Sequence, residues 1–260
     1  MDTTESILLL TIITVAYNSD RTIEPTLKSI DLFIDQYEGQ IEHLIIDGGS
    51  KDQTLQVVDK YKKPYRIVYS SRDKGIFDAM NKGASHSMGE YLWFINSDDI
   101  VHQDIITHRT EFLTLLDSRI YDILFGAIEM FDNSTMRITR RWNPSRYKLS
   151  TAINLGWTPS HPGSIIRKQL FNQLDGFNLT YERSADMDLL LRAIDSTHHS
   201  KIRIVNNKMI LFRLGGASNG SIKKIVKNNI EFYKFRRASG YGIIRSLLFI
   251  LLKLFRKLLQ

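Results

Sequence analysis

The chain has 260 residues, of which 43% are hydrophobic and 24% are charged, and it contains no cysteine. This composition is typical of a globular protein and excludes disordered and fibrous classes, while the absence of cysteine excludes disulfide scaffolds, thiolate zinc sites and cysteine nucleophiles. Residues 221–260 hold ten Lys and Arg against the single acid Glu231, so the other 220 residues carry 25 basic and 27 acidic groups, and no nucleic-acid-binding core is expected.

The first hundred residues alternate short apolar runs with helical patterns. Strands are predicted at residues 7–15, 43–46, 67–69 and 91–95, and helices at residues 22–33, 54–61 and 76–87. The strand segments lack polar alternation, which is typical of strands buried on both faces of a sheet. Strand–helix alternation at this spacing predicts an α/β fold with a mostly parallel sheet flanked by helices.

The second half of the chain is less regular. Its patterns predict strands at residues 123–131, 136–142, 202–205 and 209–213, and helices near 167–172 and up to about 195. No linker or shift in composition indicates a domain boundary before about residue 220. We therefore expect one domain at residues 1–220, followed by a basic amphipathic helical tail at residues 221–260.

The last twenty residues have the pattern of a cationic amphipathic helix. At 100° per residue, one arc holds Arg245, Ser246, Lys253, Arg256, Lys257 and Gln260, and apolar residues fill the opposite arc, with Phe249 as the exception. Residues 241–260 are therefore predicted to bind an anionic membrane surface; the alternative is docking onto the protein itself or onto a second subunit. Because residues 1–6 lack the basic region of a secretory signal, we expect a cytoplasmic protein, peripheral on the inner face of the cell membrane.

Polar segments follow each of the four strands predicted in the first half. They are residues 17–18 (YN), 47–50 (DGGS), 71–73 (SRD) and 96–99 (NSDD). Ligands bind beyond the carboxyl ends of parallel strands, so these four loops are predicted to converge on one site. The sequence has no G-x-G-x-x-G after the first strand and no P-loop, which argues against dinucleotide and kinase-type sites.

Two acidic motifs are candidates for the chemistry. Asp98 and Asp99 follow an apolar strand, and carboxylate oxygens are the ligands that Mg²⁺ and Mn²⁺ prefer. A helix cap or a surface turn is the alternative for that motif. Asp186 and Asp188 open an apolar helix, where one carboxylate is a candidate general base and the alternative is again capping.

Four segments occur in an order that points to a family. They are TVAYN at residues 14–18, IDGGSKDQT at 46–54, DKGIFDAMNKG at 73–83 and GEYLWFINSDD at 89–99. With weaker matches at residues 161–163, 186–189 and 212–216, the chain resembles family 2 glycosyltransferases over roughly residues 7–220. These are inverting enzymes of the Rossmann-like GT-A fold that use nucleotide-sugar donors. The resemblance is strongest to bacterial enzymes of exopolysaccharide and O-antigen (lipopolysaccharide) assembly.

The resemblance implies roles for individual residues. Asp186 is the implied general base, and Asp98, with Asp99, is the implied ligand of Mg²⁺ or Mn²⁺. The implied nucleotide-sugar site comprises Thr14, Ala16, Tyr17, Asn18, Asp47, Gly48, Arg72, Asp73, Gly75, Asn81, Lys82 and Ser97. Trp157 and His161 are expected on the acceptor side, with core packing as the alternative. The implied partners are a UDP- or GDP-sugar and a saccharide acceptor, which the basic tail suggests is lipid-linked.

The chain departs from the family pattern at three positions. Gly48 stands where a second acid is common, so recognition of the base is expected to rest on Asp47. Asn96 replaces the first acid of the metal motif, and Ala185 replaces a Glu beside Asp186. These departures leave open a rival interpretation, a catalytically silent binding module. A second rival is a sugar-1-phosphate nucleotidyltransferase, but the glycine-rich basic loop expected after its first strand is missing.

Overall fold

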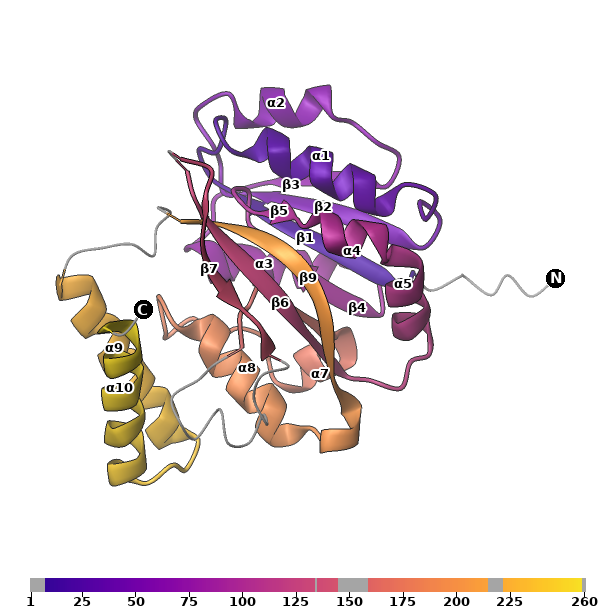
Figure 1. Cartoon of the computed structure of the whole chain (residues 1–260). Helices are drawn as coiled ribbons and strands as arrows, with labels where there is room; N and C mark the ends of the chain where they lie inside the picture. Colours follow the sequence, from indigo (N-terminus) through magenta and orange to yellow (C-terminus); the bar gives the residue numbers. More distant parts are fainter. Residues whose placement is uncertain (1–7, 134, 145–158, 215–221, 259–260) are drawn as a thin grey trace.

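Four parallel strands form the first half of the sheet in the computed structural model, which describes residues 8–133, 135–144, 159–214 and 222–258 (Figure 1). The elements are β1 (Leu10–Ala16), α1 (Ile23–Ile34), β2 (Ile41–Asp47), α2 (Thr54–Lys60), β3 (Arg66–Ser70), α3 (Ile76–His86) and β4 (Tyr91–Phe94). The strands lie in the order β3-β2-β1-β4 and pair in parallel throughout. The alternation predicted for this half of the chain is therefore confirmed.

The second half adds antiparallel strands, so the complete sheet is mixed. Its elements are β5 (Ile100–Val101), α4 (Gln103–Thr107), α5 (Arg109–Asp117), β6 (Ile123–Asp132), β7 (Ile138–Trp142), β8 (Ser164–Arg167), α7 (Lys168–Gln173), α8 (Ala185–Ser196), a 3₁₀ helix (His199–Lys201), β9 (Ile202–Leu214), α9 (Ile222–Ala238) and α10 (Ile243–Leu258). Within the described ranges, β8, β6, β9 and β5 continue the sheet from β4, and β7 pairs with β6. β8 runs antiparallel to β4 and β6, and β9 joins into one strand the two that the sequence predicts at 202–205 and 209–213.

Burial on both faces explains the apolar strand sequences. β1 is buried along its whole length, with Ile13 and Val15 in one hydrophobic cluster and Leu10 and Ile12 in another. Successive side chains of a strand point to opposite faces, so each face of the sheet needs its own helical cover. Residues of α1, α4 and α5 belong to one cluster, and residues of α3, α7 and α8 belong to the other. The sheet thus lies between two helical layers, with its loops at the edges.

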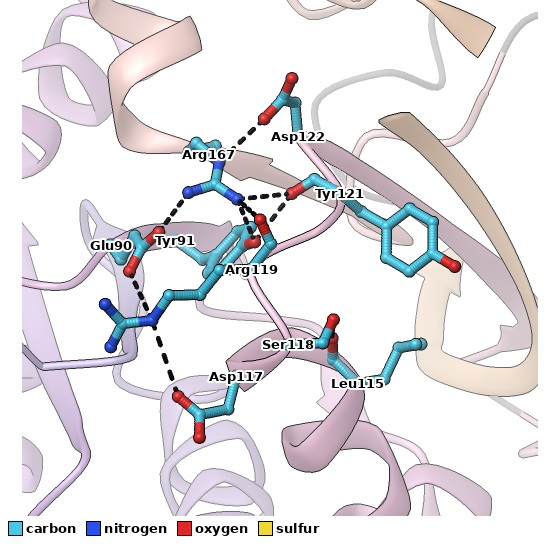
Figure 2. A network of polar contacts seen from close by, with 9 residues as sticks. All are labelled: Glu90, Tyr91, Leu115, Asp117, Ser118, Arg119, Tyr121, Asp122 and Arg167. Carbon is cyan, nitrogen blue, oxygen red and sulfur yellow. Dashed lines mark hydrogen bonds and ion pairs between the residues drawn. The ribbon is translucent and has the colours of Figure 1, made fainter. Parts of the chain in front are cut away.

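Arg167 connects three strands on the side of the sheet where the parallel strands β1 to β4 begin (Figure 2). Its guanidinium pairs with Glu90 and, at 2.8 Å, with Asp122, and it donates to the Tyr91 hydroxyl at 2.9 Å. It also donates to the carbonyl oxygens of residues 119 and 121. Because the planar guanidinium carries five donors, one side chain satisfies acceptors at the starts of β4 and β6 from the end of β8. This network holds β8 in register between its neighbours.

The tail helices pack onto the body of the protein. α9 contacts α8, and α10 lies against α9 (Figure 1). Phe232, Phe235 and Phe249 are buried and belong to the same hydrophobic cluster as α8. The Arg236 guanidinium lies 4.0 Å from the ring centroid of Tyr241 and 4.2 Å from that of Phe249. The domain boundary between residues 220 and 221 stays a prediction.

α10 buries part of the arc that the sequence pattern assigns as polar. Ser246 and Phe249 are 0% exposed, whereas Ile244 is 81% and Leu251 is 62% exposed. Phe249, the apolar exception on that arc, packs against Phe232 with 6.1 Å between ring centroids. Several apolar side chains of α10, Ile244 and Leu251 among them, therefore remain at the surface, whereas Phe249 is buried. No helix in the described part of the chain has both the length and the apolar character to span a bilayer.

Candidate active site

The four polar loops predicted from the sequence are joined at the carboxyl edge of the parallel strands. Hydrogen bonds of 2.8–3.0 Å link the Gly48 N–H to the Ala16 carbonyl, the Lys51 N–H to the Asn18 side chain, the Ser19 hydroxyl to the Ser97 hydroxyl, and the Ser71 N–H to the Asp47 carbonyl. These bonds connect the loop after β1 to the loops after β2 and β4, and the loop after β2 to the loop after β3. The loops therefore form one continuous surface, as the parallel strand order requires.

Thr14 lies beneath this surface and is held by a buried histidine. Its hydroxyl is 2.9 Å from Nε2 of His43, and Nδ1 of the same ring accepts from Nε of Arg66 at 2.9 Å. Burial and the nearby Arg66 charge hold the pKa of His43 well below its ordinary value, so the ring is neutral. Since Nδ1 accepts, the proton of the neutral ring is on Nε2 and is donated to Thr14. A hydrogen-bonded chain thus crosses β3, β2 and β1 below the loops.

Asp47 is completely buried and bonds to its own loop. Its carboxylate accepts from the N–H of Gly49 at 3.1 Å, from the N–H of Ser50 at 3.1 Å and from the Ser70 hydroxyl at 2.6 Å. Gly49 adopts φ +83°, and a Cβ placed on it would lie 3.5 Å from Cγ of Arg72. The carboxylate thereby shapes the turn on which Arg72 rests, and it has no exposed surface of its own.

Tyr17, Gly48, Asp73 and Gly75 are neighbours in the same loops, with Tyr17 and Gly75 exposed and Gly48 buried. A Cβ placed on Gly48 would lie 3.2 Å from Cγ of Asp73 and 3.4 Å from Cδ2 of Tyr17, whose side chain is 60% exposed. Oδ1 of Asp73 accepts from the N–H of Gly75 at 2.8 Å. Gly75 has φ +123°, a conformation that strongly favours glycine. Residues from three loops that the sequence predicts at the nucleotide site are therefore neighbours.

Asn81 and Lys82, also predicted at the nucleotide site, are bonded to protein groups. The Asn81 side chain accepts from the N–H of Phe177 and donates to its carbonyl, both at 2.9 Å. Lys82 Nζ donates to the Arg72 carbonyl at 2.8 Å and pairs with Asp78 at 3.2 Å. These two residues of α3 therefore hold neighbouring loops in place, a role that their sequence motif does not reveal.

The loop after β4 carries the acidic motif, and its two carboxylates differ in environment. Asp99 is completely buried and accepts from the Asn96 amide at 3.1 Å and from the N–H of Arg213 at 3.4 Å. Asp98 is half-buried, and its carbonyl accepts from Nε of Arg213 at 3.2 Å. Burial raises the pKa of Asp98, and burial together with the Asp98 charge raises the pKa of Asp99 well above its usual range. Asp98 is thus the carboxylate nearer the surface, and Asp99 supports the loop from below.

Asn96 and Asp98 carry oxygen atoms of the kind that hard divalent ions prefer. Oδ1 of Asn96 is buried and has no hydrogen-bond partner in the part of the chain that the structure describes. An unpaired buried acceptor costs about 1–3 kcal/mol, and coordination of a cation would remove that cost. Amide and carboxylate oxygens are suitable ligands for Mg²⁺ and Mn²⁺, which also take water and substrate phosphates. The described residues contain no group of three or more His, Cys, Asp or Glu arranged to enclose a metal.

Asp186 is the second residue of α8 and is half-buried. Asp188, the other acid of the motif, is buried and pairs with Arg192 at 2.7 Å. Arg192 also donates to the carbonyl oxygens of residues 174 and 176. The charge of Asp188 is therefore balanced inside the protein by a side chain that anchors the preceding turn. Of the two acids, Asp186 is therefore the one that keeps exposed surface.

Two residues of α9 hold the segment immediately before Asp186. The N–H of Arg183 donates to the Glu231 carboxylate at 3.0 Å, and the Ser184 hydroxyl donates to the Asn228 side chain at 2.5 Å. Glu231 is only 7% exposed, and it is the single acid of residues 221–260. The tail thereby fixes the start of the helix that carries the candidate base.

His161 lies in a cluster of aromatic rings beside the end of β4. Its ring centroid is 5.4 Å from those of Phe94 and Phe177, and Nε2 is buried without a partner among the described residues. Burial lowers the pKa of His161 to about 4, so the ring is neutral near pH 7. Contact with the acceptor stays a prediction for this residue. Trp157, the other residue expected on the acceptor side, lies outside the described residues.

The neutral His161 predicts a loss of stability in mild acid. Its folded-state pKa of about 4 lies below the ordinary value of 6.5, so the unfolded chain binds the proton first as the pH falls. The neutral ring therefore contributes about 3 kcal/mol to the free energy of unfolding above pH 6.5, and this contribution is lost as the pH falls from 6.5 to 4. Urea unfolding of His161→Phe is expected to show a smaller loss between pH 7 and 4.5 than the wild type, whereas replacement of the exposed His199 by Gln leaves that loss unchanged. A wild-type pH dependence in His161→Phe would contradict the assignment.

Residues 11–175 match the sequence profile described as Glycosyl transferase family 2. The chain belongs to this family. An uncharacterised glycosyltransferase of Mycobacterium tuberculosis (strain CDC 1551 / Oshkosh) is 28% identical over 185 residues, 70% of this chain and 67% of the relative. A Bacillus subtilis (strain 168) protein, provisionally named a teichuronic acid biosynthesis glycosyltransferase, is 32% identical over 108 residues, 40% of this chain and 42% of the relative.

Solved structures share the fold of this family 2 glycosyltransferase. Residues 1–349 of Staphylococcus aureus TarS in complex with UDP-GlcNAc give a TM-score of 0.69 at 18% identity, covering 95% of this chain and 72% of that one. The mannosyltransferase PcManGT from Pyrobaculum calidifontis in complex with GDP-Man and Mn²⁺ gives a TM-score of 0.62 at 14% identity, and the match covers 93% of this chain and 69% of that one. Identities this low show the fold alone. The expected GT-A-like fold and the transferase class are confirmed.

The family 2 motifs locate the loops, but several residues that support them are missed by sequence reasoning. Arg213 contacts both Asp98 and Asp99, and Phe177 joins α3 to the end of β4 through Asn81. Arg213 lies in the weakly matching segment 212–216, which is the one sequence signal for it. Phe177 carries no such signal, because its contacts come from elements that are distant in the sequence.

Proposed function

We propose that this glycosyltransferase transfers a sugar, with inversion, from a UDP- or GDP-linked donor to a saccharide acceptor in the assembly of a surface polysaccharide. The proposal rests on the joined surface of four loops at the carboxyl ends of β1 to β4, with Asp98 within that surface. The complexes of TarS with UDP-GlcNAc and of PcManGT with GDP-Man support a nucleotide-sugar donor. The name of the Bacillus subtilis relative supports a polysaccharide product.

In the proposed reaction, the Asp186 carboxylate accepts the proton of an acceptor hydroxyl. The hydroxyl oxygen attacks the anomeric carbon from the face opposite the diphosphate, and the bond from that carbon to the diphosphate oxygen breaks, its electrons leaving with the nucleoside diphosphate. Asp98 and the Oδ1 of Asn96 would hold Mg²⁺ or Mn²⁺, which supplies stabilisation of the charge on the departing diphosphate. Tyr17 and Arg72 line the donor side.

Nucleotide sugars test this proposal without knowledge of the acceptor. In the presence of Mn²⁺, one UDP- or GDP-sugar of a panel is expected to raise the unfolding temperature, because a ligand present at 100 times its Kd stabilises the native state by about 2.7 kcal/mol. Slow release of the nucleoside diphosphate from that donor is expected in the same mixture. Binding without release would favour the silent module, and no binding by any member of the panel would refute the donor class.

We further propose that α10 docks on an anionic membrane surface and so brings the enzyme to a lipid-linked acceptor. Its outer face exposes Ile243, Ile244, Leu247, Leu248 and Leu251 by 49–81%. Residues 221–260 carry ten basic groups against one acid. An apolar face beside a surplus of positive charge is the combination that binds headgroups and acyl chains of anionic bilayers.

Exposed leucines of α10 are expected to decide vesicle binding. The triple variant Leu247→Gln, Leu248→Gln, Leu251→Gln is expected to bind vesicles containing phosphatidylglycerol at least about tenfold more weakly, because each leucine contributes apolar area. Co-sedimentation measures the loss, and thermal unfolding checks that the fold is kept. Leu32→Gln, which changes a leucine of α1 that is 56% exposed, serves as the matched control. Equal binding by the triple variant and the wild type would exclude α10 as the docking face.

A further inference from the structure

The second loop of the site has Gly48 where the family pattern commonly has a second acid, and the resemblance implies a role in base recognition for the acids of this loop. The neighbouring Asp47 is 0% exposed. Its carboxylate accepts from two N–H groups of its own loop and from the Ser70 hydroxyl at the end of β3. A carboxylate committed in this way has no free edge for a ligand. Recognition of the base by Asp47, the expectation from the sequence, therefore finds no support in its surroundings.

The Asp73 side chain lies against Gly48. Gly48 is not among the residues with positive φ, so its backbone tolerates other residues. A Cβ at this position, however, would collide with Oδ2 of Asp73, and it would lie 3.2 Å from Cγ of the same side chain. The Asp73 carboxyl group therefore occupies the place beside the backbone of residue 48 where a side chain of that residue would begin.

The two oxygens of the half-buried Asp73 side chain differ in their partners. Oδ1 accepts from the N–H of Gly75 at 2.8 Å, which fixes the orientation of the carboxylate. The described residues provide no hydrogen bond to Oδ2, which lies against Gly48. The ring of Tyr17, 60% exposed, lies next to the same glycine and offers a flat apolar surface on which a base can stack.

We propose that Asp73 replaces the missing acid at position 48 and reads the nucleobase of the donor, a role that rests on the proposed nucleotide-sugar transferase function. A carboxylate accepts from the ring N–H of uracil or guanine, whereas the corresponding ring nitrogens of cytosine and adenine are themselves acceptors and repel it. Asp73 therefore selects a base with a ring N–H. Lys82, which donates to the carbonyl of Arg72, holds the loop that presents Asp73.

Titration calorimetry with UDP, GDP, CDP and ADP in the presence of Mn²⁺ tests the proposal. The wild type is expected to bind UDP or GDP and to discriminate against CDP and ADP. Asp73→Asn keeps an acceptor for the N–H of Gly75 but presents an N–H to the base. The affinity for the preferred nucleotide is therefore expected to fall at least about tenfold. Where that nucleotide is UDP, the same variant is expected to gain affinity for CDP.

A relocated carboxylate provides the decisive control. Asp73→Gly and Gly48→Asp are each expected to weaken binding, the first by removing the acid and the second by forcing two carboxylates into one place. The double variant Gly48→Asp/Asp73→Gly is expected to recover affinity to within about threefold of the wild type. Unchanged binding by Asp73→Asn, or no recovery in the double variant, would overturn the assignment. Failure of the wild type to bind any of the four nucleotides would instead refute the proposed function.

Discussion

Replacing Asp186 with Asn is expected to lower the rate of sugar transfer by about 10²–10⁴-fold, the contribution of a positioned general base. The amide has nearly the same shape as the carboxylate but does not accept the proton of the acceptor hydroxyl. Affinity for the donor is expected to stay unchanged, because the donor side is built from the loops after β1 to β4. Steady-state transfer rates and calorimetric binding of the donor measure the two effects separately.

Asp188 provides the control for this prediction. It lies two residues away on the same helix and is paired with Arg192 inside the protein. Asp188→Asn removes a buried charge partner, so it is expected to lower the free energy of unfolding by about 3 kcal/mol or more, whatever its effect on the reaction. Equal loss of donor binding and of transfer in Asp186→Asn would contradict the base role, as would a fall in stability like that of Asp188→Asn.

Replacing Asp98 with Ala is expected to abolish the effect of Mn²⁺ on donor binding and to lower kcat/KM about 10³-fold. Metal ions stabilise transition-state charge by several kcal/mol, and Asp98 is the charged group of the proposed ligand set. The exposed Asp59 pairs with Lys62 on the surface of the protein. Asp59→Ala therefore controls for the loss of one negative charge and is expected to keep the response to Mn²⁺.

The readout for Asp98 is the difference in donor affinity measured with Mn²⁺ and with EDTA. In the wild type this difference is expected to be large, and in Asp98→Ala it is expected to disappear. Asp99→Ala is expected to act differently, because Asp99 is completely buried and supports the loop through Asn96 and Arg213. Its main effect is expected on the free energy of unfolding. An undiminished response to Mn²⁺ in Asp98→Ala would place the metal elsewhere or remove it from the mechanism.

The amino-acid sequence alone determined the parallel half of the sheet and the loops of the site. The strands there are short apolar runs separated by amphipathic helices, and both patterns are local properties that a window of a few residues contains. Parallel order then places the polar residues after each strand at the same edge. Tyr17, Gly48, Asp73 and Ser97 could therefore be placed near one another without knowledge of a single contact.

Only the tertiary structure decided which of these side chains remain available to a ligand. Asp47 and Asn81 belong to conspicuous motifs, yet the first is enclosed by its own loop and the second bridges to Phe177, 96 residues away. β5 likewise pairs Ile100 with Leu211 across more than a hundred residues. Such contacts depend on which distant segments meet in the fold. The local sequence around a polar side chain is the same whether that side chain is exposed to solvent or hydrogen-bonded to a distant segment. The sequence motifs thus locate the site, and tertiary packing determines which of its polar side chains are hydrogen-bonded within the protein and which face a ligand.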